Sequence, residues 1–356
     1  MRRTAVVVFF ALVPLMALFG VGVYNALGAS KTRAPSTPKP VTKSRTLVPV
    51  PGAVYLSQGG SLYRLENGQF TQMQPGPGAW SQPALAPDGH LVAISRQTHF
   101  SDLYLLDALG HPVRQLTKNA SGAVEFNHWA FYPNVSPDGK TLLYSYDPKD
   151  RSNIYRVDLA IWAMPLDGSQ SDARGRTTPT PYTGGDVQPL ALQSGAILYT
   201  KYGIDDDGHS VSQLWLQPRP GVPGQALTDA RDDCSSPALS RDGSRLAMIC
   251  TGGKQTSRLQ VAPFDGQKIG APDVLLDGAL AAVPAWAPDG HGLLYVAPGG
   301  PGGRFQLWMV ELQPPAPSPT SAAGARPTSV SQAPLRQPRL VTNDLDLDAT
   351  SAPLWT

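Results

Sequence analysis

The sequence predicts an all-β chain folded as a six-bladed β-propeller. A seven-residue phrase that starts with Pro and most often ends in Pro-Asp-Gly recurs along the chain, and successive copies begin 47 to 69 residues apart. Repeats of about this period, each with short strands and turn residues, are typical of propeller blades. The two ends of the chain also each carry part of one blade, which indicates a closed ring. The copies are residues 83–89, 133–139, 189–195, 237–243, 284–290 and, cut short, 353–356.

Each repeat contains the sequence signals of four short strands. The Asp-Gly pair that ends the phrase tolerates positive φ, as a tight hairpin requires. The apolar run after it, such as residues 91–94, is too short for a helix and predicts a buried second strand. A third strand has an aromatic near its centre, as at 103–105, and the outer strand ends in Leu-Thr, as at 116–117. In the third repeat, two segments compete for the third strand, residues 154–157 and 161–164.

The chain termini are expected to share the first blade. Residues 54–56, 62–65 and 70–73 read as the second, third and fourth strands of a blade that has no first strand. Residues 353–355 read as a first strand with no blade behind it. Joining the two halves leaves no open sheet edge and gives six blades. An open sandwich or two separate sheets is the alternative, and it would leave both halves unexplained.

The repeats resemble the WD40-like (PD40) repeats of TolB-like six-bladed propellers. The resemblance rests on the Pro-Asp-Gly phrase, the Leu-Tyr/Trp-x-Leu strand and the Leu-Thr ending, and it covers about residues 52–356. It implies a periplasmic propeller of the bacterial envelope. TolB-like proteins carry an α/β domain before the propeller, whereas residues 1–51 are all that precede it here. A role in a Tol–Pal-like system is therefore not expected from the resemblance.

Residues 1–29 are expected to be an N-terminal transmembrane anchor, with a cleaved signal segment as the alternative. Residues 5–24 are uncharged and apolar, which is long enough to cross a bilayer and longer than the usual core of a signal peptide. Residues 26–28 offer small residues at the cleavage positions. Positive charges follow the span as well as precede it, and the positive-inside rule alone would favour a cytoplasmic propeller. The export-like N-terminus and the family resemblance favour an extracytoplasmic one, which is the orientation we expect.

Two low-complexity segments flank or interrupt the propeller. Residues 30–51 form a Pro-rich linker that is expected to be extended. Residues 313–338 form a similar insertion, expected as a surface loop in blade six between its third and fourth strands.

Charged residues make up 16% of the chain and the net charge is +2, which gives no case for nucleic-acid binding. The protein is expected to be a monomer with no nucleic-acid partner.

The only two cysteines, Cys234 and Cys250, flank one predicted hairpin of the fifth blade. Their positions are opposite each other to within about one residue, and an exported protein would oxidise them. A one-residue register error would instead leave two separate buried thiols. Both a disulfide and two free thiols therefore remain open at this stage.

Motifs for catalysis and for metal binding are missing from the sequence. It contains no Gly-x-Ser-x-Gly elbow, no His-Glu-x-x-His and no Cys-x-x-Cys. Residues 205–208, Asp-Asp-Asp-Gly, have some likeness to a calcium loop but lack the alternating spacing and distal Glu of an EF-hand. No cofactor is expected, with a divalent ion such as calcium in a loop or in the channel as the alternative.

The predicted topology places one set of loops around one mouth of the central channel. Loops between second and third strands, and loops leading into first strands, open on the same face and are where propellers usually bind ligands. Aromatic residues there could also simply cover the ends of adjacent blades. The candidate binding-face residues are Trp80, His99, His128, Trp129, Tyr132, Asp147, Arg151, Asp186, Asp205, Asp207 and His209.

These observations lead to two functional hypotheses. The first is a membrane-tethered, extracytoplasmic propeller that acts as a non-catalytic binding or scaffold module for an envelope protein, peptide or glycan. The second is an extracytoplasmic enzyme of the lyase, cyclase or hydrolase type with a site in the central channel. The fold alone does not choose between them.

Overall fold

The computed structural model describes residues 46–149, 153–154, 156–312 and 337–356. All of them belong to one compact unit, Val41–Thr356. No helix within these described ranges is long and apolar enough to cross a membrane. The predicted anchor at residues 1–29 lies outside the described residues, and so do residues 30–45 of the linker and 313–336 of the insertion.

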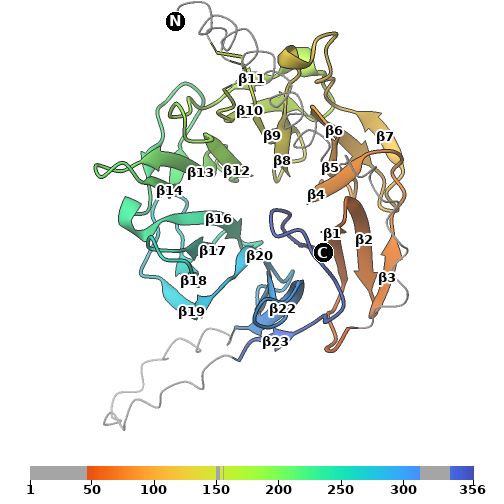
Figure 1. Cartoon of the computed structure of the whole chain (residues 1–356), viewed down its shortest axis with the longest axis vertical. Coiled ribbons are helices and arrows are strands. Elements are labelled where there is room, and N and C mark those ends of the chain that lie inside the picture. Colours follow the sequence, from red (N-terminus) through yellow and green to blue (C-terminus); the bar gives the residue numbers. More distant parts are fainter. Residues whose placement is uncertain (1–45, 150–152, 155, 313–336) are drawn as a thin grey trace, which may run out of the picture. The chain divides into compact units, whose positions relative to one another are not determined.

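Six four-stranded antiparallel sheets form a ring, as the repeats predict (Figure 1). The innermost strand of each sheet begins a blade, and the following strands lead outward. Blade 1 contains β24 (Leu354–Trp355), β1 (Ala53–Gln58), β2 (Ser61–Glu66) and β3 (Gln69–Gln72). Blade 2 contains β4 (Ala79–Leu85), β5 (Leu91–Arg96), β6 (Ser101–Leu106) and β7 (Pro112–Gln115). Blade 3 contains β8 (Ala130–Val135), β9 (Thr141–Tyr146), β10 (Ala160–Pro165) and β11 (Arg174–Gly175).

The second half of the ring repeats this plan, and short 3₁₀ helices lie between some of the strands. Blade 4 contains β12 (Asp186–Ala191), β13 (Ile197–Ile204), β14 (Ser210–Gln217) and β15 (Gln225–Ala226). Blade 5 contains β16 (Cys234–Leu239), β17 (Arg245–Cys250), β18 (Ser257–Pro263) and β19 (Asp273–Ala279). Blade 6 contains β20 (Ala282–Trp286), β21 (Gly292–Pro298), β22 (Phe305–Glu311) and β23 (Arg339–Leu340). The 3₁₀ helices are η1 (Val124–Phe126), η2 (Gln170–Asp172) and η3 (Ala230–Asp232).

The two ends of the propeller close the ring, which confirms the shared first blade. β24 pairs with β1, placing Val54 opposite Trp355. The Trp355 indole is 9% exposed, packs in the core between blades 6 and 1, and donates from Nε1 to Pro51 O at 2.7 Å. The last residues of the linker also join this core, because Val50 is buried and Leu47 N donates to Val341 O. The edge of blade 1 is thereby paired rather than left open.

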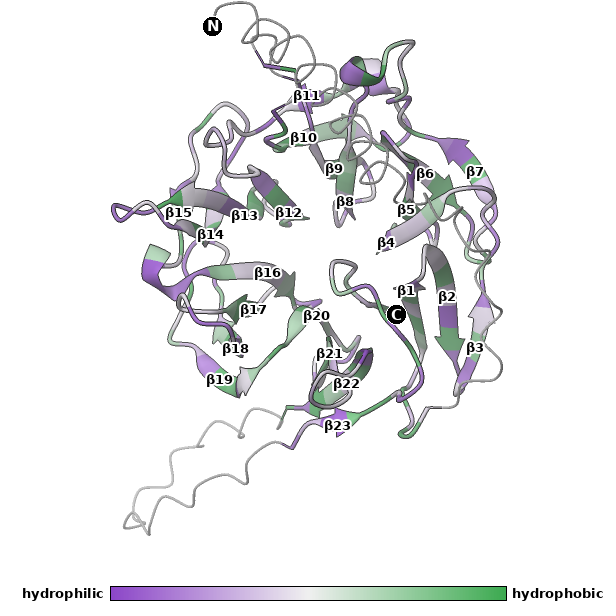
Figure 2. Ribbon diagram, in the orientation of Figure 1, coloured by the Kyte–Doolittle hydropathy of each residue, from purple (hydrophilic) through white to green (hydrophobic). Residues whose placement is uncertain are grey.

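The core lies between neighbouring blades. The second strands are almost wholly buried, as their continuous apolar runs predict, because both faces of each sheet pack against another blade. Figure 2 shows the hydrophobic residues gathered along these strands. In one such layer, Ile94 and Leu103 of blade 2 meet Leu142 and Met164 of blade 3. Each blade is therefore stable only as part of the ring.

The turn chemistry read from the repeats is present in the structure. At two of the Asp-Gly hairpins, Asp88 and Asp289 accept the backbone N–H two residues ahead. The glycines that follow them adopt φ of 89° and 74°, in the region where a Cβ would strain the backbone. In blade 3, the structure resolves the two candidates for the third strand in favour of residues 161–164, which lie in β10.

Candidate functional site

A bulge recurs in the inner strands just before the repeat's proline. The residue ahead of that proline has positive φ in five blades, although none of the five is a glycine. At the same point, the pairing register with the second strand shifts in each of these blades. Non-glycine residues rarely adopt such angles, and they cluster at ligand sites more often than elsewhere. The residues are Gln82 (φ 53°), Tyr132 (52°), Gln188 (54°), Ser236 (54°) and Val283 (41°).

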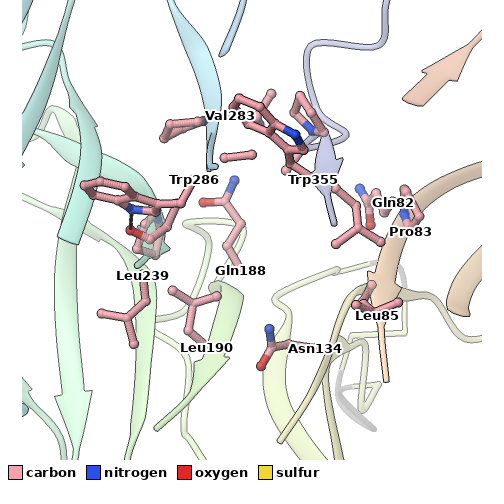
Figure 3. Close-up of a pocket in the computed structure, with 18 of the residues that line it drawn as sticks. Gln82, Pro83, Leu85, Asn134, Gln188, Leu190, Leu239, Val283, Trp286 and Trp355 are labelled. Atoms are coloured by element: carbon pink, nitrogen blue, oxygen red, sulfur yellow. Dashed lines mark hydrogen bonds between the residues drawn. The ribbon is translucent and has the colours of Figure 1, made fainter. Parts of the chain in front are cut away.

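The bulged strands enclose a cavity of about 580 Å³ on the axis of the ring (Figure 3). Residues from all six blades line it, from the level of the bulges to the Asp-Gly turns. Its volume falls within the ~300–1,000 Å³ of ordinary ligand pockets. Its larger apolar lining residues are Leu85, Leu190, Leu239, Val283, Trp286, Leu354 and Trp355, together with the prolines of the repeats.

The polar groups of this cavity are mostly bonded across blade boundaries. Gln82 Oε1 accepts Tyr132 N at 2.6 Å, and Gln188 Oε1 accepts Ser236 N at 3.0 Å. Trp286 Nε1 donates to Ala238 O at 2.9 Å, so its indole is fixed at the wall. Burial raises the pKa of Tyr132 to about 12, which keeps its phenol neutral at physiological pH. These bonds hold the wall rigid and leave a largely apolar surface toward the lumen.

Among the described residues that line the cavity, Arg241 has the one charged side chain. It is exposed and lies in the blade 5 hairpin, where three other repeats have proline. Its neighbour Asp242 is held instead by the hydroxyls of Ser240 and Ser244 and by the backbone N–H of Ser244, which keep the pKa of that carboxyl near 2. The cavity therefore has an apolar interior and a single cation at its mouth.

The predicted binding face lies at the opposite ends of the strands, and the structure divides its aromatic residues. Trp80 is 3% exposed, bonds Gly76 O through Nε1, and packs edge-on against Tyr104, so it is a core residue. Trp129 is half-buried, stacks on Phe131 and lies under the Arg96 guanidinium. Of the predicted face residues that the structure describes, only Tyr132 also lines the channel cavity.

Two acids of the predicted face are buried rather than displayed. Asp147 is 1% exposed and pairs with Lys149 at 2.7 Å. Asp186 is fully buried and pairs with Lys201 at 3.0 Å, yet desolvation still raises its pKa. These carboxylates contact lysines of their own loops and strands, so they fix loop geometry.

The predicted histidines and the acidic loop are spread over the same face. His128 donates from Nδ1 to Asp147 O at 2.8 Å and stacks on Tyr146, while His99 is exposed. Asp205, Asp207 and His209 bring three potential ligand atoms within 4.8 Å of one another. Asp205 is already engaged in capping its own turn. Arg151 lies outside the described residues.

The two cysteines are directly opposite each other in the β16–β17 pair and form a disulfide. Both are buried in the core between blades 4 and 5. Of the two alternatives left open by the sequence, the structure therefore supports the disulfide. The bulge in β16 lies between Ser235 and the hairpin, so it does not move Cys234 out of register with Cys250.

Sequence reasoning missed the channel lining, although a signal was present. The lining residues occupy fixed offsets around the repeat's first proline, one before it and one or two after it. The phrase predicted turns and strands, but nothing in it indicates the bulge that turns these positions toward the axis.

Comparison with solved structures finds proteins with a similar fold. TolB from Acinetobacter baumannii has a TM-score of 0.55 and 18% identity, over 73% of this chain and 61% of that one. A putative TolB from Agrobacterium tumefaciens has a TM-score of 0.51 and 16% identity, over 76% and 86%. An oligogalacturonate lyase in complex with manganese reaches only 0.48, with 15% identity over 70% and 68%, which is too low to bear on function.

No protein-family model matches the chain, and no curated protein matches it in sequence. The chain spans about six tenths of the Acinetobacter protein's length. At identities this low, the likeness concerns the fold alone. The chain has the TolB-like six-bladed β-propeller fold.

Proposed function

We propose that this propeller is a non-catalytic binding module that takes an apolar segment of a partner protein into its channel cavity. The observation that carries the proposal is the cavity itself, which all six blades line and which is apolar inside. Apolar pockets with a few fixed polar groups bind ligands by burying their surface. Trp286 and Trp355 reach the wall with only 7% and 9% of their surface exposed, so the accessible apolar contacts come largely from residues such as Leu85.

The rigidity of the wall supports binding rather than chemistry. The side-chain oxygens of Gln82 and Gln188 accept hydrogen bonds from backbone N–H groups of the next blade. Few polar groups of the cavity wall are therefore free to take part in a reaction. A preformed wall lowers the entropy lost when a segment binds. A TolB-like fold is in keeping with a protein partner.

We further propose that the propeller lies outside the cytoplasm, tethered to the bacterial membrane by the segment around residues 5–24. Two features support this. The segment is long and apolar enough to span a bilayer. The buried Cys234–Cys250 disulfide fits an oxidising compartment, where such bonds form and persist. A reporter active only outside the cytoplasm, fused to the C-terminus, tests the orientation, and an inactive reporter would contradict it.

A charge placed in the cavity tests the binding proposal. Leu85 lines the cavity and is 38% exposed, so Leu85→Glu should fold normally. Leu109, in the turn between β6 and β7 of the same blade, is 62% exposed and outside the cavity, so Leu109→Glu is the matched control. Crosslinked capture from envelope fractions should fail for Leu85→Glu and succeed for Leu109→Glu. Equal capture by both variants would exclude the cavity as the site.

The enzyme hypothesis has its own readout in the same preparation. Metal analysis of the purified protein, with the Asp205→Ala, Asp207→Ala double variant as control, should show no stoichiometric ion if the channel only binds. An ion retained at one per chain would favour an enzyme or a metal-dependent module instead, and its loss in the double variant would place it in the acidic loop rather than in the channel.

A further inference from the structure

A second pocket, distinct from the channel, opens beside blade 2. Its volume is about 330 Å³. Its outer residues Gln115, Lys118 and Ala120 are exposed, while Ser95 and Asp102 are buried. The pocket is therefore open to solvent on one side and polar at its base. Its lining residues are Ser95, Gln97, Phe100, Asp102, Tyr104, Gln115, Lys118 and Ala120.

Asp102 lies at the base of this pocket and is 4% exposed. Its Oδ1 accepts Thr117 Oγ1 at 3.0 Å and Asn119 N at 2.9 Å, and neither partner lines the pocket. Its Oδ2 accepts only Gln115 Nε2, at 3.1 Å, and Gln115 does line the pocket. Oδ2 is therefore the oxygen on the pocket side, and a carboxylate oxygen can accept more than one hydrogen bond.

No cation neutralises this carboxylate within the described part of the chain. No Lys, Arg or His nitrogen there forms an ion pair with Asp102 within 4.0 Å. Burial raises the pKa of Asp102 in spite of its three hydrogen bonds. Buried charges in proteins are as a rule paired, because an unpaired one is costly. Its charge thus requires an explanation.

The architecture of the blade does not require a charge at this position. Blade 6 places Gln306 at the corresponding position, one residue before the buried leucine of the third strand. Gln306 Oε1 accepts Thr342 Oγ1 at 3.0 Å and Leu345 N at 3.1 Å, the same two kinds of bond that Asp102 Oδ1 accepts. A neutral amide therefore makes the same bonds to the end of the outer strand. The carboxylate in blade 2 adds a negative charge and an oxygen facing the pocket.

We propose that this pocket binds a small primary ammonium compound, with its –NH₃⁺ group on Asp102 Oδ2. An ammonium has three donors, and Ser95 Oγ and the Gln97 side chain lie in the same pocket as further acceptors. The Tyr104 ring also lines the pocket, and aromatic rings attract cations. Lys118 at the rim disfavours a second positive charge on the ligand, so monoamines and zwitterions fit better than diamines.

Saturation-transfer NMR with ethanolamine as the probe tests the pocket on the intact protein. Ethylene glycol, of similar size but uncharged, is the matched control probe, and putrescine tests the effect of a second charge. We expect binding of ethanolamine, none of ethylene glycol, and weaker binding of putrescine. Equal signals from ethanolamine and ethylene glycol would overturn the proposal, because they would indicate a hydrated pocket with no ammonium site.

Substitutions at Asp102 separate the charge from the fold. Asp102→Asn keeps the shape, and Asp102→Gln copies Gln306, so both should retain the native circular dichroism and melt cooperatively. Both should lose ethanolamine affinity by at least about tenfold, since they remove the negative charge that strengthens the hydrogen bond to the ammonium group. Lys118→Ala should strengthen putrescine binding and leave ethanolamine binding unchanged. Full ethanolamine binding by folded Asp102→Asn would refute the assignment.

This pocket and the channel can fail independently. Leu85→Glu, which tests the channel, should leave ethanolamine binding unchanged because Leu85 does not line the blade 2 pocket. Loss of ethanolamine binding in that variant would contradict the claim that the two sites are separate.

Discussion

Replacing Trp355 by Ala tests whether the ring is closed by the meeting of the chain's two ends. Trp355 is 9% exposed, lies in the core shared by blades 6 and 1, and donates from Nε1 to Pro51 O at 2.7 Å. Removing such an indole costs about 3–5 kcal/mol through lost burial and the cavity left behind. That is a large part of the ~5–15 kcal/mol that holds a typical domain together.

The assay is urea unfolding followed by far-UV circular dichroism, with Trp355→Phe as the control. The Phe variant keeps an aromatic side chain in the core but lacks the indole N–H donor. We therefore expect its free energy of unfolding to fall by about 1–2 kcal/mol, close to the contribution of one buried hydrogen bond. The closure also predicts where the Ala variant opens first. Limited proteolysis should cut near β1 and β24 before it cuts blades 3 and 4. A loss below about 1 kcal/mol for Trp355→Ala, or no change in the cleavage sites, would refute the claim that Trp355 stabilises the closed ring.

Three further predictions follow from single sites. The Cys234→Ala, Cys250→Ala double variant should lose about 3 kcal/mol in the same assay, because the bond closes a loop of 16 residues in the unfolded chain; an unchanged unfolding midpoint would contradict this. For Asp102, the raised pKa means that the folded state takes up a proton more readily than the unfolded state. The stability of Asp102→Asn relative to the native protein should therefore rise as pH increases from about 4 through the folded-state pKa, and a pH-independent difference would refute the shift. Trp129→Ala should lower the free energy of unfolding by about 1–2.5 kcal/mol, the combined contribution of the stack on Phe131 and the Arg96 contact. It should leave partner capture through the channel intact. Failed capture by the folded variant would indicate that the partner binds the other face.

Much of the architecture could be read from the sequence because propeller blades depend on local signals repeated in order. Asp-Gly pairs fix hairpins, continuous apolar runs fix buried second strands, and the incomplete blades at the two ends indicate closure. The pairing of Val54 with Trp355 is what that reading predicts. The third strand of blade 3 was ambiguous, because residues 154–157 and 161–164 have similar composition and only their packing against β9 distinguishes them.

The candidate site was read less well, because burial depends on neighbours that are distant in sequence. Trp80 and Trp129 look alike as aromatic residues leading into a first strand, yet Trp80 is enclosed by Tyr104 and blade 1 while Trp129 remains half-exposed. In the sequence, Asp147 and Asp186 resemble solvent-exposed loop acids. Their ion pairs with Lys149 and Lys201 form only in the folded chain.

The sequence by itself determined the number of blades, their strand order and the way the ring closes, because each of these depends on short patterns of turn and apolar residues. The tertiary structure alone decided where ligands can bind. The channel cavity arises from bulges in five inner strands that, together with β24, meet only when the ring is complete. The Asp102 pocket is a potential site because its carboxylate is buried beside a pocket and has no counter-ion within 4.0 Å among the described residues, whereas blade 6 has the neutral Gln306 at the equivalent position.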